Sequence, residues 1–124
     1  MPGVTLHTFD FSAIGTDWRI DYAASSTGKN DIETEIIRMA DDFDKVFSRF
    51  REGSLVRRLT DNGGSVSMPA YAGELINFYH ELYEATDGSF TPLIGDMLED
   101  LGYDKEYTLL DKQKKPPVLT WAEA

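Results

Sequence analysis

The stretch that decides the fold reads Thr86-Asp87-Gly88-Ser89-Phe90-Thr91-Pro92-Leu93-Ile94-Gly95. Its Asp-Gly pair is typical of the end of a helix, and its proline cannot continue one. Before it, apolar residues recur at helical spacing from residue 69 or 70 to residue 86. We therefore expect a long helix that ends in this turn, and a shorter helix over residues 93–101 that Gly102 ends.

Toward the N-terminus, apolar and polar residues alternate along residues 5–22, which predicts strands. The residues that carry this alternation are Leu6, Phe9, Phe11, Trp18, Ile20 and Tyr22. The tetrapeptide Ala13-Ile14-Gly15-Thr16 interrupts it. A glycine inside a strand pattern marks a bulge, a bend or a close backbone approach.

Helical spacing also predicts a first long helix over residues 31–47, with Asn30 or Asp31 as its cap. A short helix should follow from Ser54 to Leu59, and glycines at 63 and 64 should end it. Ser67 is the expected cap of the second long helix, and residues 107–110 read as a strand. These elements predict an α+β fold in which antiparallel strands pack against two long helices.

The chain has 124 residues, no cysteine and a formal net charge of -10. Its length fits a single domain, residues 1–124. The lack of cysteine excludes disulfides and thiolate sites, and the acidic balance disfavours nucleic-acid binding. An acidic solvated surface explains the charge most simply, with binding of a divalent cation as the alternative. The sequence shows no run long enough to span a membrane and no signal peptide, so we expect a cytoplasmic location.

General catalytic patterns are weak in this sequence. No glycine-rich nucleotide motif is present, and the pair Gly63-Gly64 follows a helix rather than a strand. His7 reads as an exposed strand residue, and a surface role is the simpler interpretation of His80. Acidic side chains share one face of the short helix, where a hard cation or, more simply, solvent would meet them. These acidic residues are Asp96, Glu99 and Asp100.

Three segments, in this order, resemble the FAD:protein FMN transferase family (ApbE type, thiamine biosynthesis lipoprotein-like). Phe9–Thr16 is similar to the family's opening strand with its apolar-Gly-Thr break. Phe47–Ser54 is similar to a segment with an aromatic residue and a serine that opens a short helix. Thr86–Gly95 resembles the family's Gly-Ala-Phe-Asp-Pro-Thr-x-Gly turn. The order and spacing of these segments carry the resemblance, which runs from about Phe9 to the end.

The resemblance implies an enzyme that cleaves FAD, transfers FMN to a Thr or Ser hydroxyl of a target flavoprotein and releases AMP. Some relatives hydrolyse FAD to FMN and AMP instead. The family requires Mg²⁺, which neutralises the diphosphate during phosphoryl transfer. The resemblance also implies that this chain is the N-terminal portion of an ApbE-like, T-fold-like domain and is truncated. The Mg²⁺ ligands are then expected beyond Ala124, and no catalytic or metal residue is assigned here.

Position by position, the resemblance implies six cofactor-binding residues. These are Ile14, Gly15, Phe50, Ser89, Phe90 and Thr91. Simple core packing is the alternative for both phenylalanines. Ile14 stands where methionine is common, and Phe50 stands where a polar-tipped aromatic is common. Thr91 replaces an aspartate that many members have, so its hydrogen bonding to FAD should be weaker or different.

Two hypotheses follow, from different classes of protein. In the first, this chain is part of a Mg²⁺-dependent FMN transferase, and the isolated chain is inactive and binds FAD weakly. In the second, it is a non-catalytic, truncated flavin-binding or interaction module. Apolar helix faces and sheet edges left bare in such a portion would favour self-association, so a homo-oligomer is left open.

Overall fold

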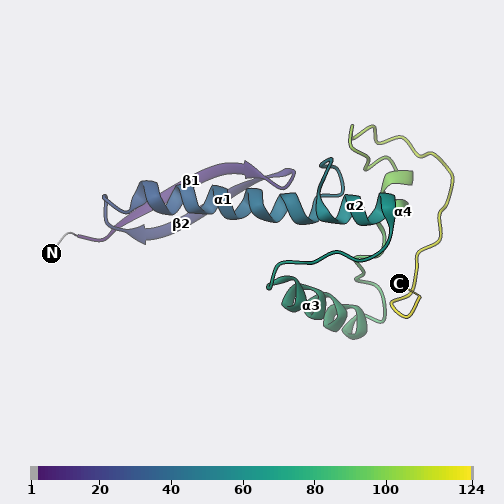
Figure 1. The fold of residues 1–124 in the computed structure, drawn as a ribbon. Coiled ribbons are helices and arrows are strands. Elements are labelled where there is room, and N and C mark those ends of the chain that lie inside the picture. The colour runs from purple at the N-terminus through teal and green to yellow at the C-terminus, as the bar shows by residue number, and fades with distance from the viewer. Residues whose placement is uncertain (1–2, 124) are drawn as a thin grey trace. The chain divides into compact units, whose positions relative to one another are not determined.

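The computed structural model describes residues 3–123 of the chain. They form two compact units, one that ends at Ser65 and one that begins at Val66. An antiparallel pair of strands and several helices confirm the predicted α+β fold (Figure 1). The single domain over residues 1–124 stays a prediction.

The first unit begins with a β-hairpin, β1 (Thr5–Ala13) and β2 (Thr16–Ala24). The strands pair antiparallel in a register that sets Ala13 opposite Thr16, so Ile14 and Gly15 alone form the turn. Both turn residues have positive φ, 55° and 72°. A two-residue turn of this kind matches the right-handed twist of the strands. The interruption seen in the sequence is therefore the hairpin turn.

One face of the hairpin is half-buried, and the other is exposed and mostly polar. The half-buried side chains are His7, Phe9, Phe11, Ala13, Ile20, Tyr22 and Ala24. On the outer face Asp10 pairs with Arg19 across the strands at 2.7 Å. The inner face packs along α1 (Lys29–Phe47), where the hydroxyl of Tyr22 donates to Glu33 at 2.8 Å (Figure 1). The prediction of an exposed His7 is wrong, because odd-numbered positions of β1 share this inner face.

The bond between Tyr22 and Glu33 predicts an alkaline limit to stability. Burial, the bond to Glu33 and the Glu33 charge raise the pKa of Tyr22 to about 12. The unfolded chain releases this proton near pH 10, so the stabilisation is present below pH 10 and is lost as the pH rises toward 12. Urea unfolding at pH 8 and pH 11 should show a larger loss in the wild type than in Tyr22→Phe. Equal losses in the two proteins would contradict this role for Tyr22.

Of the two caps predicted for the helices of the first unit, the one for α2 (Leu55–Asn62) is present and the one for α1 is absent. Helix α1 begins at Lys29 after Gly28, without a side-chain cap, so Asn30 and Asp31 lie inside its first turn rather than capping it. Asp31 still interacts favourably with the positive end of the helix dipole there. Helix α2 is capped as predicted, because the hydroxyl of Ser54 accepts from the Arg57 N–H.

The second unit contains α3 (Ala72–Ala85) and α4 (Gly95–Asp100). Ser67 is not a cap, because α3 begins later, after Tyr71, and has no side-chain cap. The predicted strand over residues 107–110 is also wrong. Its backbone bonds are local, since the N–H groups of Thr108 and Leu109 donate to the Asp104 carboxylate and the Gly102 carbonyl. Such local acceptors compete with strand pairing.

Among the described residues, the few that are fully buried include polar as well as apolar side chains. Val46 and Ala72 are the buried apolar residues of residues 3–123, and Ser54, Asp100 and Asp104 are the buried polar ones. Buried polar groups need hydrogen-bond partners, so their contacts define local structure. Within the same residues, none of the helices is long and apolar enough to cross a membrane.

Candidate functional site

The tip of the β-hairpin presents an exposed apolar residue on a strained backbone. Ile14 is 45% exposed and has a φ of 55°, a conformation that β-branched residues rarely adopt. Two bonds hold the flanking residues: Trp18 Nε1 donates to the Ala13 carbonyl at 3.0 Å, and Ser12 Oγ donates to Asp17 at 2.6 Å. Strain of this kind concentrates at functional sites. The tip can therefore offer a fixed apolar contact.

A shallow depression lies beside this tip. It has a volume of about 480 Å³. It is lined by Ser12, Ala13, Gly15, Thr16 and Asp17. Because Gly15 has no side chain, a ligand can approach the backbone of the turn closely. Gly15 lines this depression and Ile14 does not, and the predicted contact of both residues with a flavin stays a prediction.

Phe50 lies in the loop between α1 and α2, where serine side chains shape the backbone. Its N–H donates to Ser48 Oγ at 3.3 Å, and Ser54 Oγ donates to the Ser48 carbonyl at 2.6 Å. The guanidinium carbon of Arg49 lies 4.0 Å from the centre of the Phe50 ring. This cation–π contact occupies one face of the ring and brings a positive charge to it. Phe50 is half-buried, which is compatible with core packing and with a ligand contact.

The turn after α3 begins with two left-handed residues, Asp87 (φ 51°) and Gly88 (φ 77°). The Gly88 N–H donates to the Tyr83 carbonyl at 2.8 Å, and the Asp87 N–H donates to Glu84 at 3.2 Å. This pair of bonds is the Schellman arrangement that ends many helices. The predicted helix end and turn are therefore present, with Thr86 as the last residue before the reversal.

The three predicted contact residues of this turn lie side by side in the second unit. Ser89 is exposed, and Phe90 is 40% exposed with its ring centre 5.8 Å from that of Tyr79. The Thr91 hydroxyl accepts the Leu93 N–H at 3.1 Å. Phe90 therefore packs on Tyr79 and keeps a large accessible surface, so core packing accounts for only part of its environment.

The structure groups the predicted residues in two sets. Ile14 and Gly15 adjoin at the hairpin tip, and Phe50 belongs to the same unit on a different loop. Ser89, Phe90 and Thr91 form the set in the other unit. Their roles in binding FAD stay predictions.

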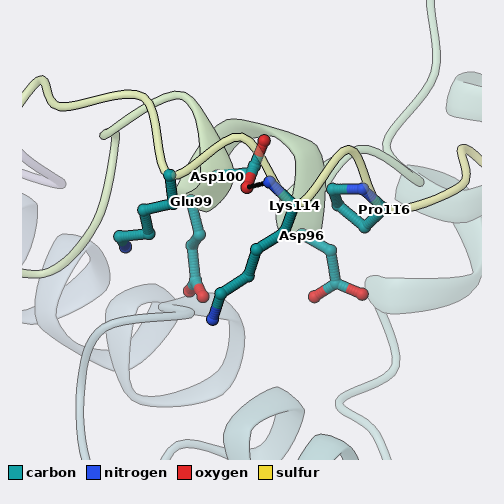
Figure 2. A pocket seen from close by; sticks show the side chains of 6 residues that line it. Asp96, Glu99, Asp100, Lys114 and Pro116 are labelled. Carbon is teal, nitrogen blue, oxygen red and sulfur yellow. Dashed lines mark hydrogen bonds between the residues drawn. The ribbon is translucent and has the colours of Figure 1, made fainter.

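The acidic residues of α4 line a pocket of about 240 Å³ (Figure 2). Its lining is Asp96, Glu99, Asp100, Lys112, Lys114 and Pro116. Asp100 is 5% exposed, and its carboxylate accepts the N–H groups of Lys114 at 2.8 Å and Lys115 at 3.2 Å. Figure 2 shows this carboxylate turned toward the loop, whereas those of Asp96 and Glu99 point the other way. Asp100 therefore holds the loop through its carboxylate and is not part of a solvated helix face.

The described residues do not fit a Mg²⁺ site. Across residues 3–123, no group of three or more His, Asp or Glu side chains is arranged to hold a metal ion. Of the acidic side chains on the helix face that suggested a cation, Asp100 points away from the other two and accepts the backbone N–H groups of Lys114 and Lys115.

A second buried aspartate, Asp104, holds the same loop. It is 7% exposed and accepts the N–H and hydroxyl of Thr108 at 3.0 and 2.7 Å, and Lys112 Nζ lies 3.1 Å away. The Thr108 N–H and hydroxyl, aided by Lys112, hold the pKa of Asp104 well below its usual range. From the sequence, Asp100 is assigned to a solvated or cation-binding helix face and Asp104 is given no role, because a loop that folds back onto a helix leaves no periodic signal.

Comparison with known proteins places these features in a family. The model of the ApbE family matches residues 14–121. The structure is similar to the ApbE protein from Thermotoga maritima, with 26% identity and a TM-score of 0.72 over 86% of this chain and 35% of that chain. It is also similar in fold to the flavin transferase ApbE from Vibrio cholerae, with 17% identity and a TM-score of 0.72 over 98% of this chain and 38% of that one. No curated protein matches. The chain thus spans little more than a third of either solved relative.

Proposed function

The chain belongs to the ApbE family, and from this membership we propose that it is the N-terminal part of an FAD:protein FMN transferase. The proposed enzyme transfers FMN from FAD to a Thr or Ser hydroxyl of a target flavoprotein in the presence of Mg²⁺. The observation that carries the proposal is the family match over residues 14–121, which includes all six predicted contact residues. A flavin transferase among the solved structures of the same fold supports it.

In the proposed reaction, the hydroxyl oxygen of the target attacks the phosphorus of the FMN moiety. The bond from that phosphorus to the bridging oxygen breaks, and AMP leaves with the bridging oxygen and its electron pair. The hydroxyl proton is released to solvent. Residues 3–123 hold no group of three or more side chains arranged to bind Mg²⁺. The part played by this chain is to bind and orient the flavin.

Five of the six predicted residues have a defined physical role in that binding. Ile14 supplies an apolar contact from a fixed turn, and Gly15 leaves room for the ligand at the backbone. Phe50 and Phe90 supply aromatic surface for stacking or edge contacts. The Thr91 hydroxyl already accepts the Leu93 N–H, and its proton remains able to donate to an acceptor atom of FAD. An aspartate at this position would only accept, so Thr91 changes the polarity of the contact.

Two observations favour a second candidate function, that of a non-catalytic module. The described residues hold no cluster suited to a metal, and the chain spans 35% and 38% of the two solved relatives. A non-catalytic flavin-binding or interaction module would share both properties. The cytoplasmic location and the oligomeric state stay predictions under either function.

The two functions are separated by a transfer assay. The full-length protein, incubated with FAD, Mg²⁺ and an acceptor flavoprotein, should add one FMN to the acceptor and release an equal amount of AMP. The 124-residue chain alone should give no adduct and bind FAD weakly. Intact mass spectrometry of the acceptor measures transfer, and a reaction with EDTA is the control.

Each other outcome has a defined meaning. AMP release without an adduct would identify an FAD hydrolase, and neither product from the full-length protein would overturn the enzyme proposal. An adduct formed by the 124-residue chain would show that residues in this chain suffice for metal binding and catalysis.

A further inference from the structure

Thr86 makes an unusual set of bonds at the end of α3. Its hydroxyl donates to the Leu82 carbonyl at 2.7 Å, with the Tyr83 carbonyl 3.4 Å away, and accepts the Phe90 N–H at 2.9 Å. Its backbone carbonyl accepts the Ser89 N–H at 3.1 Å. One residue therefore connects the last turn of the helix to two successive residues of the following turn.

The Schellman bonds at Asp87 and Gly88 set the reversal of the chain but stop at Gly88. Beyond that point, the bonds described here for the N–H groups of Ser89 and Phe90 both end on Thr86. The direction in which the Phe90 side chain leaves the backbone therefore depends on Thr86. Its ring then contacts Tyr79 on one side and remains 40% exposed.

The chemistry of a hydroxyl suits this position. A hydroxyl has one proton to donate and lone pairs that accept, so it serves the Leu82 carbonyl and the Phe90 N–H at the same time. Valine has nearly the same shape but neither function, and serine has both functions but lacks the methyl group. These two substitutions separate the hydroxyl from the side-chain shape.

We propose that Thr86 is the positioning residue of the flavin-contacting turn: its hydroxyl fixes the Phe90 backbone and so presents the Phe90 ring to the ligand. The part that concerns FAD rests on the proposed function. The part that concerns the turn rests on the bonds of Thr86 alone.

The test compares Thr86→Val with Thr86→Ser in the full-length protein. Hydrogen exchange of the Phe90 amide reports the turn, and steady-state transfer with FAD separates KM from kcat. In Thr86→Val we expect the Phe90 amide to lose protection and KM for FAD to rise about five- to tenfold, as expected for one lost hydrogen bond, with kcat within about twofold. Thr86→Ser should keep the Phe90 amide protection and the KM for FAD close to those of the wild type. Thr86 is exposed, and Thr86→Ala gives a second variant should the valine variant fail to fold.

Thr60 provides a matched control. Its hydroxyl also donates to a carbonyl four residues earlier, that of Val56 at 2.9 Å, and it lies on α2. Thr60→Val should leave the Phe90 amide and KM for FAD unchanged.

A Thr86→Val protein with normal KM would overturn the positioning role, as would equal losses in the serine and valine variants. A wild type that neither transfers FMN nor binds FAD would refute the proposed function, and unchanged Phe90 exchange in Thr86→Val would still refute the role of Thr86 in the turn.

Discussion

Replacing Phe90 by alanine in the full-length protein is expected to raise the Kd for FAD about 30-fold, which corresponds to about 2 kcal/mol. The ring is 40% exposed, and its backbone is held by Thr86. An aromatic side chain on a fixed turn loses little entropy when it meets a ligand, and its removal deletes a large contact area. Titration of FAD, followed by flavin fluorescence, measures the effect.

Phe78 offers a control on the same helix. It is an exposed phenylalanine of α3 that is not one of the six predicted contact residues. Phe78→Ala should therefore leave the Kd for FAD unchanged. Phe90→Tyr keeps the ring and should bind FAD nearly as well as the wild type. An unchanged Kd in Phe90→Ala, combined with a lower melting temperature, would show that Phe90 serves only packing against Tyr79.

Elements with a strong local pattern could be predicted from the sequence. The alternation along residues 5–22 predicts strands, because a period of two places Phe9, Phe11 and Ile20 on one face; that these strands form a hairpin comes from the structure. Ser54 could be identified as a cap because it directly precedes a short apolar-periodic segment and its hydroxyl can reach the Arg57 N–H. In both cases, neighbours in the sequence decide the structure.

Features that depend on bonds formed outside a periodic pattern could not be predicted. The segment at residues 107–110 has strand-forming residues, but Asp104 and Gly102 bind its N–H groups and hold it in a loop. Asp100 has the sequence environment of a solvated helix residue, yet it is buried and accepts the N–H groups of Lys114 and Lys115, more than ten residues away. A period-based argument contains no information about such closures.

In the candidate site, too, some features could be predicted from the sequence and others could not. The residue types at the hairpin tip and at the turn after α3 carry the family resemblance, and their local geometry follows from Gly15 and from the Asp87-Gly88 pair. The role of Thr86 could not be predicted from the sequence, since its hydroxyl acts through bonds to Leu82 and Phe90 that only the folded turn creates. Contact with FAD is a property of the complex, so those assignments remain for binding experiments to test.

Replacing Gly102 by alanine is expected to release the loop that folds back on α4. Gly102 is buried, with a φ of 95°, and a Cβ there would lie 2.3 Å from Leu110 N and 2.5 Å from Leu109 C and Cα. All three atoms belong to the backbone, so no side chain can turn away. The loop must move, which breaks the bond from the Leu109 N–H to the Gly102 carbonyl and loosens the hold of Asp104 on Thr108.

The cost has two parts. A non-glycine residue at this positive φ is destabilising by about 1–2 kcal/mol, and the lost bonds of a buried loop bring the total to about 3 kcal/mol. Urea unfolding measures the total, and trypsin should cleave the released loop sooner at its lysines. These are Lys105, Lys112 and Lys114, whereas Lys115 precedes Pro116 and resists trypsin. Gly73→Ala is the matched control, because Gly73 lies inside α3 with open space around its Cβ position, and alanine there should stabilise by up to about 1 kcal/mol. Wild-type stability and cleavage in Gly102→Ala would mean that the loop does not approach the Gly102 backbone this closely.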